Sequence, residues 1–159
     1  MKNIFYFYCA LFIGNVYAQT HQIQKHNGET FLINYIKTDE NLIHYTWPNQ
    51  NEHQVISNFA VATLTHISTS KSHDVSTKME WNAPKKQNVS KVIKCSETHG
   101  LTPYQTISVF LGRPKGISDT DFTKLKHAKL HEKAKLHDAP FVCIIEESFD
   151  EVKALLFRY

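Results

Sequence analysis

Two histidines four residues apart carry the clearest chemical signal in this chain. His127 and His131 fall in a segment with helical periodicity, Thr120–His137, so both imidazoles would lie on one helix face and could hold one metal ion. His137 could add a third ligand if the last turn bends. The alternative is a solvated helix face that uses histidine without binding a metal, because five lysines in the same segment would repel a cation.

Residues 1–18 have the pattern of a secretory signal peptide. Lys2 is followed by an apolar run, Ile4–Ile13, and Val16 and Ala18 place small residues at the −3 and −1 positions of a cleavage site. The run is about half as long as the roughly 20 residues that a membrane-spanning helix needs. We therefore expect cleavage after Ala18, a secreted or periplasmic mature chain, and no transmembrane segment after cleavage.

Cys95 and Cys143 are the cysteines that remain after such cleavage. In an oxidising compartment they could form a disulfide, which would close a loop of about 50 residues and stabilise the fold by about 3–4 kcal/mol on the chain-entropy account. The alternative is a pair of buried free thiols, since Cys143 lies in the apolar run FVCII. Their separation excludes a redox C-x-x-C motif.

The other patterns that could support catalysis are incomplete. The segment His131–Lys135 begins like a zinc-protease helix but has lysine where the second histidine should stand. Residues 112–116, GRPKG, lack the spacing of a phosphate-binding loop. The acidic residues between positions 146 and 151 favour a solvated turn over acid–base chemistry. We therefore expect no catalytic residues, no cofactor and no enzymatic activity.

Composition is that of an ordinary globular protein. Charged residues make up 21% of the chain and hydrophobic residues 42%. The net charge of +3 is small and the lysines are dispersed, so we expect neither a nucleic-acid partner nor an acidic membrane surface. Ten histidines is the one unusual count.

Residues 19–68 predict a β-rich module. Candidate strands lie near residues 20–24, 31–36, 42–47, 54–57 and 62–67, and turn-prone residues separate them. These strands predict an antiparallel meander that forms a small open barrel or a curled sheet. Tyr35, Tyr45 and Trp47 share a register, which favours a sheet core, with a ligand or partner surface as the alternative.

Residues 91–159 predict an α+β domain. We expect strands near residues 92–95, 106–111, 141–145 and 152–157, with one main helix between the second and the third. The order β-β-α-β-β predicts a sandwich in which the helix packs on a sheet. The long stems of the helix lysines are expected to flank an apolar stripe without burying their charge. Residues 69–90 are polar and predict a linker, with one short strand at Lys78–Trp81 as an alternative.

Short patterns in both modules also occur in other proteins. The residues concerned are Asn27-Gly28-Glu29, Ile36-Lys37-Thr38, Ile43-His44-Tyr45, Leu130, Ala134, Ala139 and the apolar run Phe141–Ile144. On these residues the chain resembles small secreted proteins of Bacteroidetes-like bacteria, which are mostly uncharacterised. The helix-to-strand part resembles the YbjQ-like family, linked to heavy-metal binding, and the RcsF-like envelope sensors. Asp138 stands where those families usually have glycine, which predicts a less secure left-handed helix cap.

The resemblance implies an α+β fold and assigns no activity. The function that these observations favour is a non-enzymatic binding or interaction module of the cell envelope, whose ligand or partner protein the sequence does not identify. Exposed sheet edges would allow such a module to form a homo-oligomer. The alternative function is a metal-binding envelope protein that uses His127 and His131.

Overall fold

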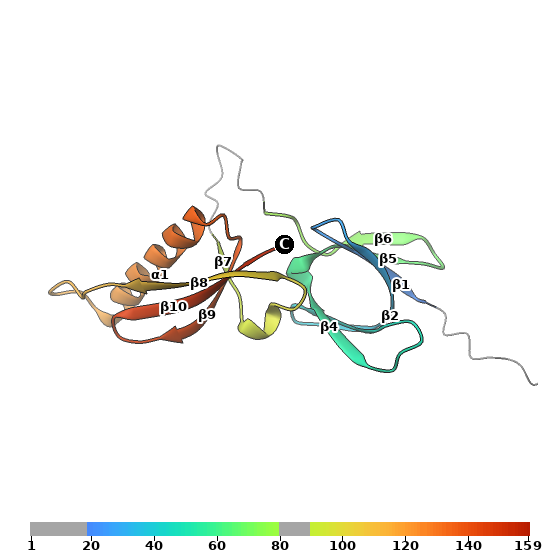
Figure 1. Cartoon of the computed structure of the whole chain (residues 1–159), viewed down its shortest axis with the longest axis horizontal. Coiled ribbons are helices and arrows are strands. Elements are labelled where there is room, and N and C mark those ends of the chain that lie inside the picture. The colour runs from blue at the N-terminus through green and yellow to red at the C-terminus, as the bar shows by residue number, and fades with distance from the viewer. Residues whose placement is uncertain (1–18, 80–89) are drawn as a thin grey trace, which may run out of the picture.

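A computed structural model of the chain describes residues 19–79 and 90–159. The elements are β1 (His21–Lys25), β2 (Thr30–Asp39), β3 (Leu42–Thr46), β4 (His53–Ser57), the 3-10 helix η2 (Asn58–Ala60), β5 (Val61–His66), β6 (Lys71–Asp74), β7 (Lys91–Val92), the 3-10 helix η3 (Cys95–Glu97), β8 (Thr102–Phe110), α1 (Asp119–Leu136), β9 (Phe141–Glu147) and β10 (Glu151–Arg158). They form a six-stranded and a four-stranded sheet that lie side by side (Figure 1). The predicted α+β class is confirmed, and the predicted signal peptide lies outside the described residues.

The first sheet is antiparallel throughout, with the strand order β4-β3-β2-β1-β5-β6. Three strands separate β4 from β5 in the sheet, yet only the three residues of η2 separate them in the chain. The sheet therefore has to curl until β4 and β5 approach each other. Register shifts between Gln24 and Lys25 and between Tyr35 and Lys37 mark bulges, which increase the local twist.

The curled sheet encloses the apolar side chains of alternating strand positions. Ile33 and Ile43 are fully buried, while Leu32 and Ile36 on the opposite face of β2 are exposed, as a period of two requires. Tyr45 is buried, and Trp47 packs against the same core together with Tyr35. The aromatic side chains thus belong to the core of the sheet.

The predicted linker contains an additional strand. β6 pairs with β5 in antiparallel register, and the Val75 N–H continues the contact by donating to the Ala62 carbonyl at 2.8 Å. Every residue of β6 is exposed and polar, so no hydrophobic pattern could indicate it. The alternative strand at Lys78–Trp81 is not seen at Lys78 and Met79, which lie outside any strand; the rest of that range lies outside the described residues.

The second sheet has the strand order β7-β9-β10-β8 and is covered on one face by α1 (Figure 1). β7 runs parallel to β9, and the other pairs are antiparallel. Leu130 and Ala134 of α1 are fully buried against the sheet residues Ile107, Val142 and Leu156. The first predicted strand of this domain ends at Val92, because η3 forms at Cys95–Glu97 where the strand was expected to continue.

α1 is capped at both ends. The Ser118 side chain accepts a hydrogen bond from the Asp121 N–H, which satisfies one free amide of the first turn. At the other end Asp138 adopts a left-handed conformation with φ of 49°. The amides of Asp138 and Ala139 then donate to the carbonyls of Lys135 and Ala134, in the pattern of a Schellman motif. Aspartate therefore occupies the position that glycine would fill with less strain.

The two sheets share a hydrophobic core. Ile93, Leu101, Phe141 and Phe157 of the second half pack in one cluster with the buried residues of the first sheet. The backbone joins the halves as well, because the Ser57 N–H donates to the His99 carbonyl at 2.8 Å. The four-stranded sheet is thus buried on both faces, by α1 on one and by the first half on the other.

Candidate functional site

The structure places His127 and His131 on the predicted helix but gives them different surroundings. His127 Nε2 lies 3.2 Å from a Glu147 carboxylate oxygen on β9. The pKa of His131 is lowered, first by burial and then by the charge of His127, although a backbone hydrogen bond at Ser90 acts in the opposite direction. His137 caps the helix, with its ring beside that of Tyr104 at 6.4 Å.

Within residues 19–79 and 90–159, no three His, Cys, Asp or Glu side chains come close enough together to hold a metal ion. A metal on α1 would therefore have to rely on His127 and His131, helped by solvent. Glu147 is already engaged by a neighbouring cation, as described next. A metal site at these two histidines stays a prediction.

A buried lysine connects α1 to the turn between β9 and β10. Lys126 is only 3% exposed, and its ammonium group donates to the Ser148 carbonyl at 2.7 Å and to Glu147 at 3.0 Å. Burial of the Glu147 carboxyl raises its pKa, but the hydrogen bonds and charges of Lys126 and His127 outweigh this effect, so the pKa is lowered overall. The cluster holds the helix on the sheet and leaves no free base or acid.

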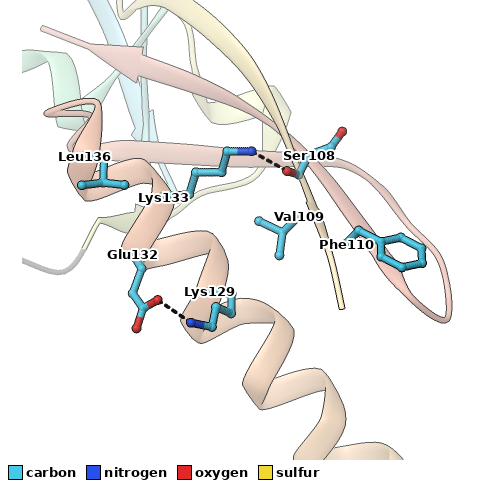
Figure 2. A pocket seen from close by; sticks show the side chains of 7 residues that line it. All are labelled: Ser108, Val109, Phe110, Lys129, Glu132, Lys133 and Leu136. Carbon is cyan, nitrogen blue, oxygen red and sulfur yellow. Dashed lines mark hydrogen bonds and ion pairs between the residues drawn. The ribbon is translucent and has the colours of Figure 1, made fainter. Parts of the chain in front are cut away.

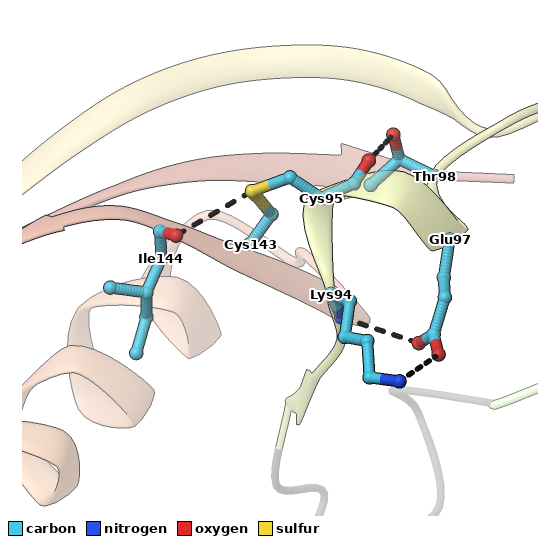
Figure 3. The surroundings of a disulfide bond; sticks show 6 residues. All are labelled: Lys94, Cys95, Glu97, Thr98, Cys143 and Ile144. Carbon is cyan, nitrogen blue, oxygen red and sulfur yellow. Dashed lines mark hydrogen bonds and ion pairs between the residues drawn. A yellow bond between two sulfur atoms is a disulfide. The ribbon is translucent and has the colours of Figure 1, made fainter.

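Cys95 and Cys143 form a disulfide between η3 and β9, with a Cα–Cα distance of 5.2 Å (Figure 3). Beside it, Glu97 is buried and accepts hydrogen bonds from the Lys94 N–H at 3.3 Å and from the Asn41 side chain at 3.1 Å. Asn41 lies in the turn between β2 and β3, so the disulfide and Glu97 together attach the start of the second half to both sheets.

A shallow groove of about 280 Å³ runs between the edge of the second sheet and α1 (Figure 2). Its lining residues are Ser108, Val109, Phe110, Lys129, Glu132, Lys133 and Leu136. The Lys133 ammonium group reaches across the groove and donates to the Ser108 carbonyl at 2.8 Å, while Lys129 pairs with Glu132 at 3.0 Å. Two lysines and one glutamate give the groove a positive balance.

The strand beside this groove, β8, ends the sheet, since no described strand lies beyond it. The Leu111 N–H donates to the Asp150 carbonyl of the neighbouring segment at 2.9 Å. Backbone groups alternate in direction along an antiparallel strand, so those of Val109 and Ile107 also face β10. The N–H and C=O groups of the alternate residues Thr106, Ser108 and Phe110 consequently point outward.

β8 is the longest edge strand among the described residues. It has nine residues and none of them is charged, whereas β4 has five residues, β6 has four that include Lys71 and Asp74, and β7 has only two. Charged side chains and short strands protect sheet edges from pairing with other chains. Phe110 is 71% exposed and Leu136, across the groove, is 83% exposed. β8 is thus a long, weakly protected edge with apolar side chains beside it.

A serine–histidine pair that sequence reasoning did not find lies between β1 and the segment after β6. His26 Nε2 and Ser76 Oγ are 2.8 Å apart, a distance compatible with a nucleophile and its base. However, the Ser76 hydroxyl donates to the Val61 carbonyl at 2.8 Å. His26 must then donate its own proton to Ser76, which is the reverse of what activation of the serine requires. The pair is a structural link.

Comparison of the chain with protein-family models, with curated proteins and with solved structures finds no match. The candidate site therefore has to be interpreted from its own geometry. On that basis the groove beside β8 is the strongest candidate, because it combines outward-facing backbone groups, apolar side chains and a net positive charge. The resemblance noted from the short sequence patterns stays a prediction.

Proposed function

We propose that this chain is a non-enzymatic binding module that holds an extended segment of a partner protein along β8. The observation that carries this proposal is a nine-residue, uncharged edge strand with a groove between it and α1. An added strand would form main-chain hydrogen bonds with the outward-facing groups of Thr106, Ser108 and Phe110. Its alternate side chains would contact the groove, which is the usual basis of affinity and specificity in recognition by strand addition.

The charge of the groove favours an acidic partner segment. The Ser108 carbonyl accepts a hydrogen bond from Lys133. An amide of an incoming strand would replace Lys133 as the donor to this carbonyl. The displaced ammonium group would then face the bound segment and attract a carboxylate, while Lys129 stays paired with Glu132. A second copy of this chain fits less well, since β8 has no carboxylate to offer to the lysines of its partner.

The proposed setting is the outside of the cytosol, as a secreted or periplasmic protein. Two features support this setting: the signal-peptide pattern of residues 1–18 and a disulfide between Cys95 and Cys143, a bond that persists mainly in oxidising compartments. Mass spectrometry of the natively expressed protein tests it. A chain that begins at Gln19 is expected; a chain that retains Met1 and stays in the cytosol would contradict it.

A peptide titration tests the proposed binding. The probe is an end-blocked peptide of alternating valine and glutamate, and its counterpart of alternating valine and lysine is the control. The acidic peptide is expected to bind about tenfold more tightly or better, a difference of about 1.4 kcal/mol. Lys133→Glu should abolish this preference, because it reverses the charge at the groove. Lys135→Glu makes the same change at an exposed position outside the groove and should preserve it.

Three results would contradict the proposal. The acidic peptide could bind no better than the basic one, or Lys133→Glu and Lys135→Glu could weaken binding equally. The protein could also form a dimer through β8, which Ser108→Pro would disrupt by removing an outward-facing amide while leaving the side of the strand that faces β10 intact. In that last case the natural occupant of the edge would be a second copy of the chain.

A further inference from the structure

Two histidines on the outer face of the first sheet bring their ring nitrogens together. His44 lies on β3 and His53 on β4, and His44 Nδ1 is 3.2 Å from His53 Nε2. In the strand register His53 is opposite Thr46, and His44 is opposite Val55, so the two histidines are diagonal neighbours. Ile43 and Tyr45, which flank His44 in the chain, point into the core, so the His44 ring has to point outward.

The distance between these nitrogens suits a shared metal ion. Two metal–nitrogen bonds of the usual zinc length place the nitrogens about 3.4 Å apart at a tetrahedral angle and about 2.9 Å apart at a right angle. The observed 3.2 Å, which in this structure is a hydrogen bond between the two rings, falls between these values, so a metal ion would replace the shared proton. The backbone hydrogen bonds of the β3–β4 pair hold both strands in this register, so little rearrangement would be needed for binding.

The charges around the pair are balanced rather than repulsive. Lys37 is opposite His44 on β2, but its ammonium group is paired with Asp39 at 2.8 Å.

We propose that His44 and His53 form a binding site for a divalent transition-metal ion of the class that prefers imidazole ligands, Cu²⁺ above Ni²⁺ and Zn²⁺. Solvent completes the coordination, because no third protein ligand joins the pair among the described residues. The site is exchangeable and open, and it excludes Mg²⁺ and Ca²⁺, which prefer oxygen ligands. It is independent of the β8 groove and of the proposed peptide.

Calorimetric titration of the mature chain without a histidine tag tests this site, with Cu²⁺ as the probe. His44→Gln and His53→Gln are each expected to lower the affinity about tenfold or more, because each removes one of the two ligands. The double variant His73→Gln/His99→Gln is the matched control: it removes the same number of exposed imidazoles from other parts of the chain and should leave the affinity unchanged. Mg²⁺ should give no heat of binding.

A second readout separates loss of a ligand from loss of the fold. Electron paramagnetic resonance of the Cu²⁺ complex of the unmodified protein should show two nitrogen ligands, and His53→Gln should reduce the number to one. Thermal unfolding without metal should stay unchanged in His53→Gln, because this side chain is exposed. The proposal is wrong if His44→Gln/His53→Gln binds Cu²⁺ as tightly as the unmodified chain, or if only His73→Gln/His99→Gln loses binding.

Discussion

Lys126 shows at the scale of a single residue how the helix is fixed to the sheet. Phe122, Lys126 and Leu130 lie four residues apart in turn, so Lys126 occupies the middle of the buried stripe of α1. The expectation that every helix lysine keeps its charge in solvent is wrong at this position. The carboxylate that neutralises it, Glu147, is distant in sequence, and for that reason the sequence pattern alone could not indicate the pair.

Replacing Glu147 should show how much its contact with the buried Lys126 ammonium group stabilises the fold. Glu147→Gln is expected to lower the free energy of unfolding by about 1–3 kcal/mol, because the buried Lys126 side chain loses its carboxylate partner. Urea unfolding at pH 7 measures this loss. Glu146→Gln is the control: this neighbour is well exposed and lies 3.9 Å from Lys153, so its loss should change stability little.

The same pair predicts how stability depends on pH. The pKa of Glu147 is lower in the folded protein than its ordinary value. The ionised carboxylate therefore contributes its full stabilisation of the fold at any pH above that ordinary value. This stabilisation is lost as the pH falls through the lowered pKa of the folded state. The stability difference between the unmodified protein and Glu147→Gln should therefore shrink in strongly acidic buffer. A difference that grows as the pH falls would contradict this assignment.

Asp138 offers a test of the opposite sign, because a substitution there should stabilise the fold. Its φ of 49° costs less with glycine, and the side chain contributes no hydrogen bond to the cap described above. Asp138→Gly is expected to raise the free energy of unfolding by about 0.5–1 kcal/mol, and Asp138→Ala to lower it. Thermal unfolding of both variants measures the two effects. Equal effects of glycine and alanine would show that the backbone conformation at this position is relaxed.

At the scale of elements, the connection between η3 and β8 is packed closely against β4. Gly100 has a φ of 82°, and a Cβ placed on it would lie 2.6 Å from Ile56 Cγ1 on β4. Gly100→Ala is expected to lower the free energy of unfolding by about 2–4 kcal/mol, because the backbone strain at positive φ and the steric overlap with Ile56 add. Gly116→Ala is the matched control, because Gly116 has the same φ but open space around it. A loss no larger than that of the control would contradict the close packing.

The elements that the sequence could predict are those with strong periodicity. The alternation in β2 and β3 and the helical stripe of α1 were placed within a few residues, because burial of one face dictates the spacing of apolar side chains. β6 could not be predicted, since all its side chains are exposed and it forms only through pairing with β5. The sequence predicts a strand that continues to Cys95 because Val92 and Ile93 are apolar, whereas the structure ends β7 at Val92 and begins η3 at Cys95.

The candidate groove was even less accessible to sequence analysis. The apolar residues of β8 indicate a strand, but whether that strand is central or at an edge depends on the order β7-β9-β10-β8, which is set by long-range pairing. The contact between Lys133 of α1 and Ser108 of β8 also depends on how these two elements pack, which no local sequence pattern indicates. The His44–His53 pair depends on the register of β3 and β4, which pairs positions that no local pattern connects.

At the scale of the whole molecule, the two halves should unfold together. They share one hydrophobic cluster, and the Cys95–Cys143 disulfide lies beside it, closing a loop across 48 positions of sequence. We expect a single transition with coincident fluorescence and circular dichroism curves. The double variant Cys95→Ser/Cys143→Ser should be about 3–4 kcal/mol less stable on the chain-entropy account. Two separate transitions would show that the halves are independent domains.

The central claim is that β8 accepts an extended acidic segment as an additional strand. Amide hydrogen exchange, followed by nuclear magnetic resonance with and without the alternating valine–glutamate peptide, tests it most directly. The peptide should slow exchange at Thr106, Ser108 and Phe110, whose amides point outward, while Ile107 and Val109, already paired with β10, change little. Unchanged exchange at the three outward amides with the peptide bound elsewhere would contradict the claim.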